Sequence, residues 1–207
     1  MMSELKNFSG AIIIISFLVY VSVFFLNYQE IIQYLSFNNY QFRGGYLYFD
    51  TFNQTFIEKS ELWRLITPAF IHFSFIHIIF NCLWVYVLGK TIEQIHGPIT
   101  YLGLFLFTSI LSNLAEFFFT GPSLFGGLSG FVYGMIGFVM VNELQLNKEV
   151  YGLPPAFYFF AIIWLILGFL GILELFGFGS IANFAHLGGL IGGIIYATII
   201  NIVNLKT

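Results

Sequence analysis

Long apolar runs, separated by short polar or glycine-containing segments, recur along the whole chain. A hydrocarbon core about 30 Å thick is crossed by roughly 20 apolar residues in a helix, and a helix satisfies its backbone hydrogen bonds internally. The runs do not alternate between polar and apolar residues, as the strands of a membrane barrel do. The pattern therefore predicts an all-α polytopic membrane protein, a single domain over residues 1–207, with six helices at about 8–26, 65–88, 99–119, 128–141, 156–176 and 181–203.

Two segments depart from this regular pattern. Residues 128–141 form an apolar run too short to cross a bilayer alone, so we predict a short, central fourth helix that begins inside the membrane. The segment 27–62 is polar and rich in aromatic residues, which are enriched at membrane–water interfaces. We expect this first loop to be an interfacial element rather than a mobile linker.

Composition and charge narrow the class of protein further. The chain is 58% hydrophobic and only 8% charged, and its mean hydropathy of +0.89 is typical of a protein embedded in a lipid bilayer. The net charge of −3 is thinly spread and contains no basic run, so we expect no nucleic-acid partner. Cys82 is the only cysteine, which excludes an intramolecular disulfide and a cysteine-rich metal cluster.

The basic residues suggest an orientation in the membrane. An even number of helices places both termini on one side, together with Lys6, Lys90, Lys148 and Lys206. The opposite side carries Arg43, Lys59 and Arg64, all in or next to the long first loop. Because positive charge is enriched in short cytoplasmic segments, we expect cytoplasmic termini in a multi-pass cell-membrane protein.

The stretch FGGLSGFVYG contains one hydroxyl, Ser129, at the start of the predicted fourth helix. The free N–H groups and the positive dipole end of a helix N-terminus can hold developing negative charge. Small residues recur at helical spacing in this helix and in the sixth, namely Gly126, Gly130, Gly134 and Gly137, and Ala182, Gly189 and Gly193. Close packing of these two strips would bring the imidazole of His186 beside Ser129, a pairing of nucleophile and base.

The predicted second helix carries unusual polar residues at membrane depth. His77 and Asn81 are four residues apart, so they lie on one helix face and could donate hydrogen bonds to an oxyanion. His72 is displaced around the helix, nearer the membrane surface. Each feature alone is also explained by helix packing or by interhelical hydrogen bonding. Their co-occurrence on three otherwise apolar helices favours a catalytic site.

These residues resemble the rhomboid intramembrane serine proteases in their bacterial six-helix form. The resemblance covers roughly residues 63–193, through WR at 63–64, HFSFIHIIFN at 72–81, GGLSG at 126–130 and AHLGG at 185–189. It implies that Ser129 is the nucleophile and His186 the general base, and that His77, Asn81 and the Ser129 backbone N–H form the oxyanion hole. It further implies supporting or structural roles for Tyr133, which would stack on His186, and for Gly127, Leu128, Trp63, Arg64, Glu93, Gly130 and Gly189.

The same resemblance makes LFGFGS, residues 175–180, the loop that caps the site, and the fifth helix the lateral gate for substrate. From the residues themselves we expect a dyad rather than a triad, because the carboxylate nearest to His186 in sequence, Glu174, precedes that loop. Asp50 is the only aspartate and no His-Glu-x-x-His motif occurs, which excludes two-aspartate and zinc intramembrane proteases. No metal or organic cofactor is implied.

The sequence thus predicts a serine endopeptidase that cleaves transmembrane segments of other proteins. Its cavity would open to the extracellular or periplasmic side and be lined by His72, His77, Asn81 and Ser129. One alternative is a catalytically silent relative that binds membrane clients. The other is a small transporter or proton channel, in which His72, His77, Asn81 and Glu116 would form a relay.

Overall fold

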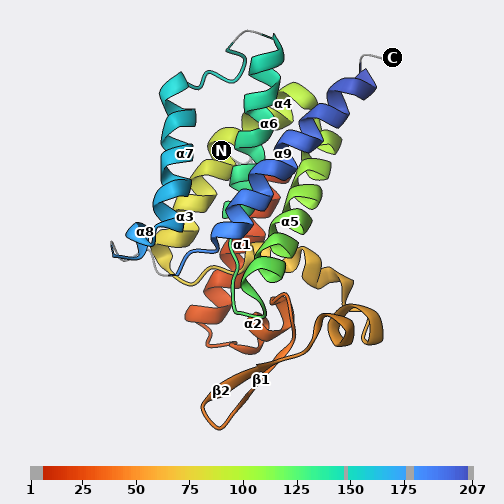
Figure 1. The fold of residues 1–207 in the computed structure, drawn as a ribbon, viewed down its shortest axis with the longest axis vertical. Helices are drawn as coiled ribbons and strands as arrows, with labels where there is room; N and C mark the ends of the chain where they lie inside the picture. Colours follow the sequence, from red (N-terminus) through yellow and green to blue (C-terminus); the bar gives the residue numbers. More distant parts are fainter. Residues whose placement is uncertain (1–6, 147–148, 176–179, 205–207) are drawn as a thin grey trace.

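The computed structural model describes residues 7–146, 149–175 and 180–204, and these are mostly helical (Figure 1). The predicted capping loop, residues 175–180, lies largely outside the described residues, since 176–179 are not among them. The same holds for Lys6, Lys148 and Lys206, on which part of the predicted orientation rests. The α-helices are α1 Phe8–Phe24, α2 Glu30–Leu35, α3 Phe75–Trp84, α4 Lys90–His96, α5 Pro98–Thr120, α6 Ser129–Leu146, α7 Pro155–Phe169, α8 Ile172–Leu175 and α9 Asn183–Asn204.

Three helical segments are long and apolar enough to cross a membrane: Phe75–His96, Pro98–Thr120 and Asn183–Val203. The first of these joins α3 and α4 through a π-helical turn, Val85–Gly89. At 1.5 Å per residue, spans of this length measure about 32–35 Å and exceed a hydrocarbon core of about 30 Å. The helices α1 and α7 are apolar but shorter. The protein is therefore an integral membrane protein, and the six-span count stays a prediction.

Several predicted helix bounds need correction. The second helix begins at Phe75 rather than at residue 65, because the chain before it forms two short 3₁₀ turns, Leu62–Leu65 and Thr67–Phe70, and Ser74 then caps α3. The fifth predicted helix is divided at Gly171, whose φ of 70° ends α7 before α8 begins. The fourth is longer than predicted, since α6 continues through polar residues to Leu146.

The core of the bundle is α6, which packs against α9 and α5, while α9 and α5 also pack against each other (Figure 1). Glycines allow this contact: a Cβ atom added to Gly189 would overlap the carbonyl oxygen of Gly130, and one on Gly193 would overlap that of Gly134. The predicted packing of the two glycine strips is thus confirmed for these four residues. Gly126 is an exception, because it precedes α6 and lies against the segment 68–71 instead.

The first loop departs from an all-α fold. Strands β1 Tyr40–Arg43 and β2 Tyr46–Phe49 form an antiparallel hairpin that projects from the end of the bundle (Figure 1). Gly44 and Gly45 both have positive φ, as a two-residue turn of matching twist requires. Aromatic and polar residues alternate in YQFR before these glycines, and the aromatic-rich run YLYF follows them, and both patterns favour strands over a helix.

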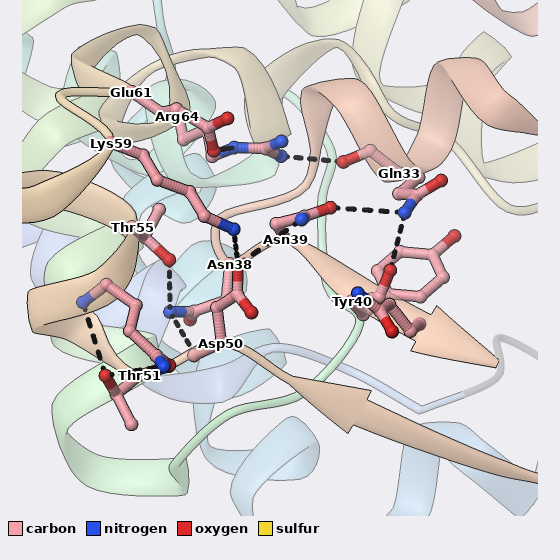
Figure 2. Close-up of polar contacts among 12 residues, drawn as sticks. Gln33, Asn38, Asn39, Tyr40, Asp50, Thr51, Thr55, Lys59, Glu61 and Arg64 are labelled. Atoms are coloured by element: carbon pink, nitrogen blue, oxygen red, sulfur yellow. Dashed lines mark hydrogen bonds and ion pairs between the residues drawn. The ribbon is translucent and has the colours of Figure 1, made fainter. Parts of the chain in front are cut away.

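A polar network holds the segment 33–64, which includes this hairpin, together (Figure 2). The guanidinium of Arg64 donates to the carbonyl oxygens of Gln33 and Ser36 and pairs with Glu61 at 2.6 Å. Asn38 Nδ2 donates to the carbonyl oxygen of Asp50, at the base of the hairpin. The guanidinium is buried, so these bonds hold the loop in one arrangement.

At the other end of the bundle, Glu93 on α4 caps α1. Its carboxylate accepts hydrogen bonds from the backbone N–H groups of Phe8 and Ser9 and from the Ser9 hydroxyl. A carboxylate at a helix N-terminus accepts hydrogen bonds from free N–H groups, and its negative charge interacts favourably with the positive end of the helix dipole. This contact fixes the start of α1 against the end of the second span.

Candidate active site

The side chains of Ser129 and His186 meet where α6 and α9 come into contact. Ser129 Oγ lies 2.8 Å from His186 Nε2, a hydrogen-bonding distance. Ser129 is the first residue of α6 and His186 lies in the first turn of α9, so both side chains stand at the same end of the bundle. The glycine contacts below them fix the separation of the two helices.

Tyr133, one turn after Ser129 on α6, stacks on the imidazole. The ring centroids of Tyr133 and His186 are 4.8 Å apart and the planes differ by 24°. The Tyr133 hydroxyl donates to the carbonyl oxygen of Ala161 on α7. The tyrosine is therefore held at both ends and limits rotation of the imidazole.

The loop before Ser129 approaches α3 very closely. Gly127 has a φ of 123°, and a Cβ added to it would lie 2.6 Å from His77 Nε2 and 3.5 Å from Asn81 Nδ2. Any larger residue would thus displace His77 and strain the backbone. The two side chains predicted as oxyanion donors consequently lie beside the peptide that leads to Ser129.

Asn81 has a further property that the sequence could not reveal. Its side-chain nitrogen is buried and has no hydrogen-bond partner in the described part of the chain. A buried donor without an acceptor is unfavourable and calls for an explanation. An acceptor that arrives only with a bound molecule or a reaction intermediate would provide one.

His72 is placed differently from its prediction. It is buried and does not line the cavity, and its Nε2 accepts a hydrogen bond from the backbone N–H of Leu128 at 3.3 Å. Because Nε2 accepts, Nδ1 must carry the proton that is shared with the carbonyl oxygen of Phe70 at 3.2 Å. His72 therefore fixes the loop beside Ser129, and the prediction that it lines the cavity is wrong.

A cavity of about 610 Å³ lies beside the Ser129–His186 pair. Its polar lining includes Ser129, His186, His77, Asn81 and Glu116. An aromatic part of the lining comes from α3 and α7, with Phe80, Trp84, Phe157, Phe160 and Trp164. The volume is sufficient for several side chains of a peptide and for water.

Two buried side chains on α5 hold the backbone next to His186, and sequence reasoning named only Glu116 of the two, as part of the transporter alternative. Glu116 Oε2 accepts a hydrogen bond from the backbone N–H of Ala185, and Ser112 Oγ donates one to the carbonyl oxygen of the same residue. Their spacing of four residues on an apolar helix was a readable signal, because it places both on one face. The partner on α9 could not be read from that spacing.

The remaining predicted residues lie outside the cavity lining. Trp63 stacks on Tyr34 in the first loop, Arg64 fastens that loop, and Glu93 caps α1. Glu174 lies on α8 and does not line the cavity. Among the residues that the structure describes, no group of three or more His, Cys, Asp or Glu is placed to hold a metal ion.

The geometry is suited to nucleophilic chemistry. A hydroxyl hydrogen-bonded to a neutral imidazole can lose its proton as it attacks an electrophilic carbon. The N–H of Ser129 is among the N-terminal groups of α6 that have no intrahelical acceptor, and the unpaired Asn81 nitrogen is close by. Such donors can stabilise the negative charge that develops on a carbonyl oxygen under attack.

The fold and site together define a mostly helical integral membrane protein with a serine–imidazole pair at a cavity between its helices. Comparison with known protein families identifies the family, because residues 59–202 match the Rhomboid domain. The chain belongs to the rhomboid family. It is 38% identical over 137 residues to Rhomboid protease GlpG of Yersinia pestis (strain Pestoides F), an alignment that covers 66% of this chain and 48% of the relative.

A second relative is Rhomboid protease GlpG of Haemophilus influenzae (strain ATCC 51907 / DSM 11121 / KW20 / Rd), which is 35% identical over 142 residues. That alignment covers 69% of this chain and 71% of the relative. The chain spans about half the length of the Yersinia relatives it matches.

Proposed function

We propose that the protein is an intramembrane serine endopeptidase that uses Ser129 and His186 as a dyad. The observation that carries this proposal is the 2.8 Å approach of Ser129 Oγ to His186 Nε2 at a cavity lined by further hydrogen-bond donors. The family and the curated relatives, which are named as rhomboid proteases, support the same reading.

In the proposed mechanism Ser129 Oγ attacks the carbonyl carbon of a peptide bond. His186 Nε2 takes the hydroxyl proton and later gives it to the leaving amine, so that the acyl group remains on Ser129. The N–H of Ser129, the side-chain nitrogen of Asn81 and His77 stabilise the oxyanion. A water molecule, activated in turn by His186, then hydrolyses the acyl-enzyme.

The cavity lining suggests the class of substrate. Its aromatic side, contributed by α3 and α7, can accept apolar side chains, whereas its polar side holds the dyad and the donors. A transmembrane segment that unwinds locally offers both apolar side chains and an exposed peptide bond. We propose that such segments enter between α3 and α7, with the site facing the extracellular or periplasmic side.

The transporter alternative is weakened by two contacts. His72 uses its ring nitrogens on the backbone of Leu128 and Phe70, and it does not line the cavity. Glu116 uses its carboxylate on Ala185. Two of the four groups of the supposed relay, His72 and Glu116, are thus engaged with backbone atoms. A catalytically silent relative would have no need of a nucleophile and a base at hydrogen-bonding distance, as Ser129 and His186 are.

A fluorophosphonate probe tests the proposal on the intact protein in membranes. We expect one labelled residue, Ser129, and loss of both the label and cleavage of a transmembrane substrate in Ser129→Ala. Ser123→Ala is the matched control, since this hydroxyl lines the same cavity but donates to the carbonyl oxygen of Gly121. A label that survives in Ser129→Ala, or cleavage by that variant, would overturn the assignment.

A further inference from the structure

We propose that Glu116 is a positioning residue for His186, which it holds through the backbone at the start of α9. The proposal rests on the proposed function of His186 as general base. Glu116 lies on α5 and is buried, and its carboxylate ends beside the first turn of α9. It touches neither Ser129 nor His186 through a hydrogen bond that the structure records.

The start of α9 lacks a side-chain cap of its own. Ala182 precedes the first helical residue, Asn183, and an alanine offers no oxygen to the free N–H groups of the first turn. Glu116 Oε2 accepts the N–H of Ala185 at 2.9 Å, the bond that a capping side chain would otherwise make. The negative charge of the carboxylate also interacts favourably with the positive end of the helix dipole. The cap of α9 is therefore supplied by α5.

Ala185 is fixed from a second direction. Ser112 Oγ donates to its carbonyl oxygen at 2.9 Å, so that α5 binds both the N–H and the C=O of the residue immediately before His186. The carboxylate of Glu116 is itself oriented, because Thr120 Oγ1 donates to its other oxygen at 3.0 Å. These bonds leave the backbone before the imidazole little freedom to move.

The same helix also contacts the nucleophile's helix. A Cβ added to Gly130, the neighbour of Ser129, would overlap Ser112 Oγ. One face of α5 therefore determines where both Ser129 and His186 stand. Without the Glu116 bond, the first turn of α9 would fray and the 2.8 Å contact between Oγ and Nε2 would lengthen in part of the population.

Three substitutions separate the hydrogen bond from the charge. Glu116→Gln keeps an acceptor oxygen at the same reach, and its amide can donate to the Thr120 hydroxyl. Glu116→Asp keeps the charge but is one methylene too short to reach Ala185. Glu116→Ala removes both. If the carboxylate acts by capping α9, the glutamine variant should resemble the wild type and the other two should not.

The experiment is cleavage of one transmembrane substrate by the full chain in proteoliposomes, with kcat and KM measured separately. We expect kcat to fall roughly 10- to 100-fold in Glu116→Ala and Glu116→Asp, because a displacement of about 1 Å in a catalytic group can reduce the rate by as much as 10²-fold. We expect KM to change less than about twofold, since both carboxylate oxygens are bonded to Ala185 and Thr120 rather than offered to a substrate. Glu116→Gln should keep kcat within about threefold of wild type.

Asn113→Ala is the matched control, because it removes another buried hydrogen bond of α5, from Nδ2 to the carbonyl oxygen of Leu65, away from α9. It should lower the unfolding temperature without lowering kcat. Wild-type kcat in Glu116→Ala would overturn the proposal. So would the reverse ranking, in which Glu116→Asp keeps kcat and Glu116→Gln loses it, even if the alanine variant does not fold.

Amide hydrogen exchange separates this proposal from the proposed function, because it needs no substrate. We expect the first turn of α9, including the Ala185 amide, to exchange faster in Glu116→Ala and Glu116→Asp but not in Glu116→Gln. If the wild type cleaves nothing and takes no label, the proteolytic function fails, and the exchange data still decide whether Glu116 holds the turn. Unchanged exchange in all three variants would overturn the positioning role.

Discussion

The two sides of the cavity are built in opposite ways. The glycine side, formed by α5, α6 and α9, holds its helices together through backbone contacts such as Gly189 on Gly130 and Gly193 on Gly134. The aromatic side, formed by α3 and α7, is held by contacts between large rings. The ring centroids of Phe80 and Trp164 are 6.0 Å apart, and those of Trp84 and Phe157 are 5.0 Å apart. The chemistry-bearing pair is on the glycine side alone.

This difference has a physical consequence for each side. Where backbones touch, a shift of a few tenths of an ångström produces a clash, so the glycine side can hold two reacting atoms at a fixed distance. Aromatic side chains keep the backbones apart and can change rotamer, so the aromatic side can yield while a substrate enters. Substitutions should therefore affect catalysis steeply on the glycine side and weakly on the aromatic side.

The largest effect is expected for His186→Ala. Loss of the general base should lower kcat by about 10⁴-fold or more, because a serine without its base is a poor nucleophile. Thermal unfolding in detergent should change little, since Tyr133 still donates to the carbonyl oxygen of Ala161 and the glycine contacts remain. Cleavage of a transmembrane substrate and the unfolding temperature are measured on one preparation. Unfolding of the variant, with activity lost for that reason alone, would make His186 a structural residue.

A smaller but still steep effect is expected for Gly189→Ala. The added methyl group would overlap the carbonyl oxygen of Gly130 and push α9 away from α6, so we expect roughly a 10²-fold loss of kcat. Gly192→Ala is the control on the same helix, because its Cβ would come closest to the flexible end of Leu111, at 3.2 Å, and would make only ordinary van der Waals contact with Thr108, at 3.5 Å. Equal activity in the two variants would show that the backbone contact does not set the dyad distance.

Asn81 lies where the two sides meet and tests the oxyanion role. Its buried nitrogen has no partner in the described part of the chain, so Asn81→Leu, of similar branched shape, should leave the unfolding temperature unchanged or raise it. Loss of an oxyanion donor should still lower kcat by roughly 10²-fold while KM stays nearly constant. A lower unfolding temperature with an unchanged kcat would identify Asn81 as a packing residue.

The Ser129–His186 pairing could be predicted because it is encoded locally. Glycines at helical spacing mark a helix face that must touch another backbone, and each strip contains one of the two reactive residues. The start of α3 was misjudged, although Pro68 interrupts the apolar pattern that was extended to residue 65. The hairpin was also missed, despite the signal of two glycines between aromatic runs.

Other parts of the site depend on pairings that no local pattern contains. His72 is separated from Leu128 by 56 residues in sequence, and Glu116 from Ala185 by 69. A buried histidine or carboxylate at membrane depth signals that some partner exists but not which one. Periodicity therefore predicted which helix faces meet, whereas the hydrogen bonds that fix the loop and the turn beside the dyad required the three-dimensional structure.

The smallest effect is expected for Phe80→Ala on the aromatic side. Phe80 is 36% exposed and its main contacts are with Trp84 and Trp164, so its removal leaves a space that neighbouring rings and lipid can fill. We expect kcat within about threefold of wild type, since no backbone near the dyad moves.

Phe131→Ala is the control from the glycine side. This ring on α6 is 1% exposed and packs on Tyr101 and Phe105, and its loss should destabilise the fold by about 3–5 kcal/mol. Both variants are assayed for cleavage in proteoliposomes and for unfolding in detergent. If Phe80→Ala lost as much activity and stability as Phe131→Ala, the aromatic side would be as rigid as the glycine side, and the contrast drawn between them would be wrong.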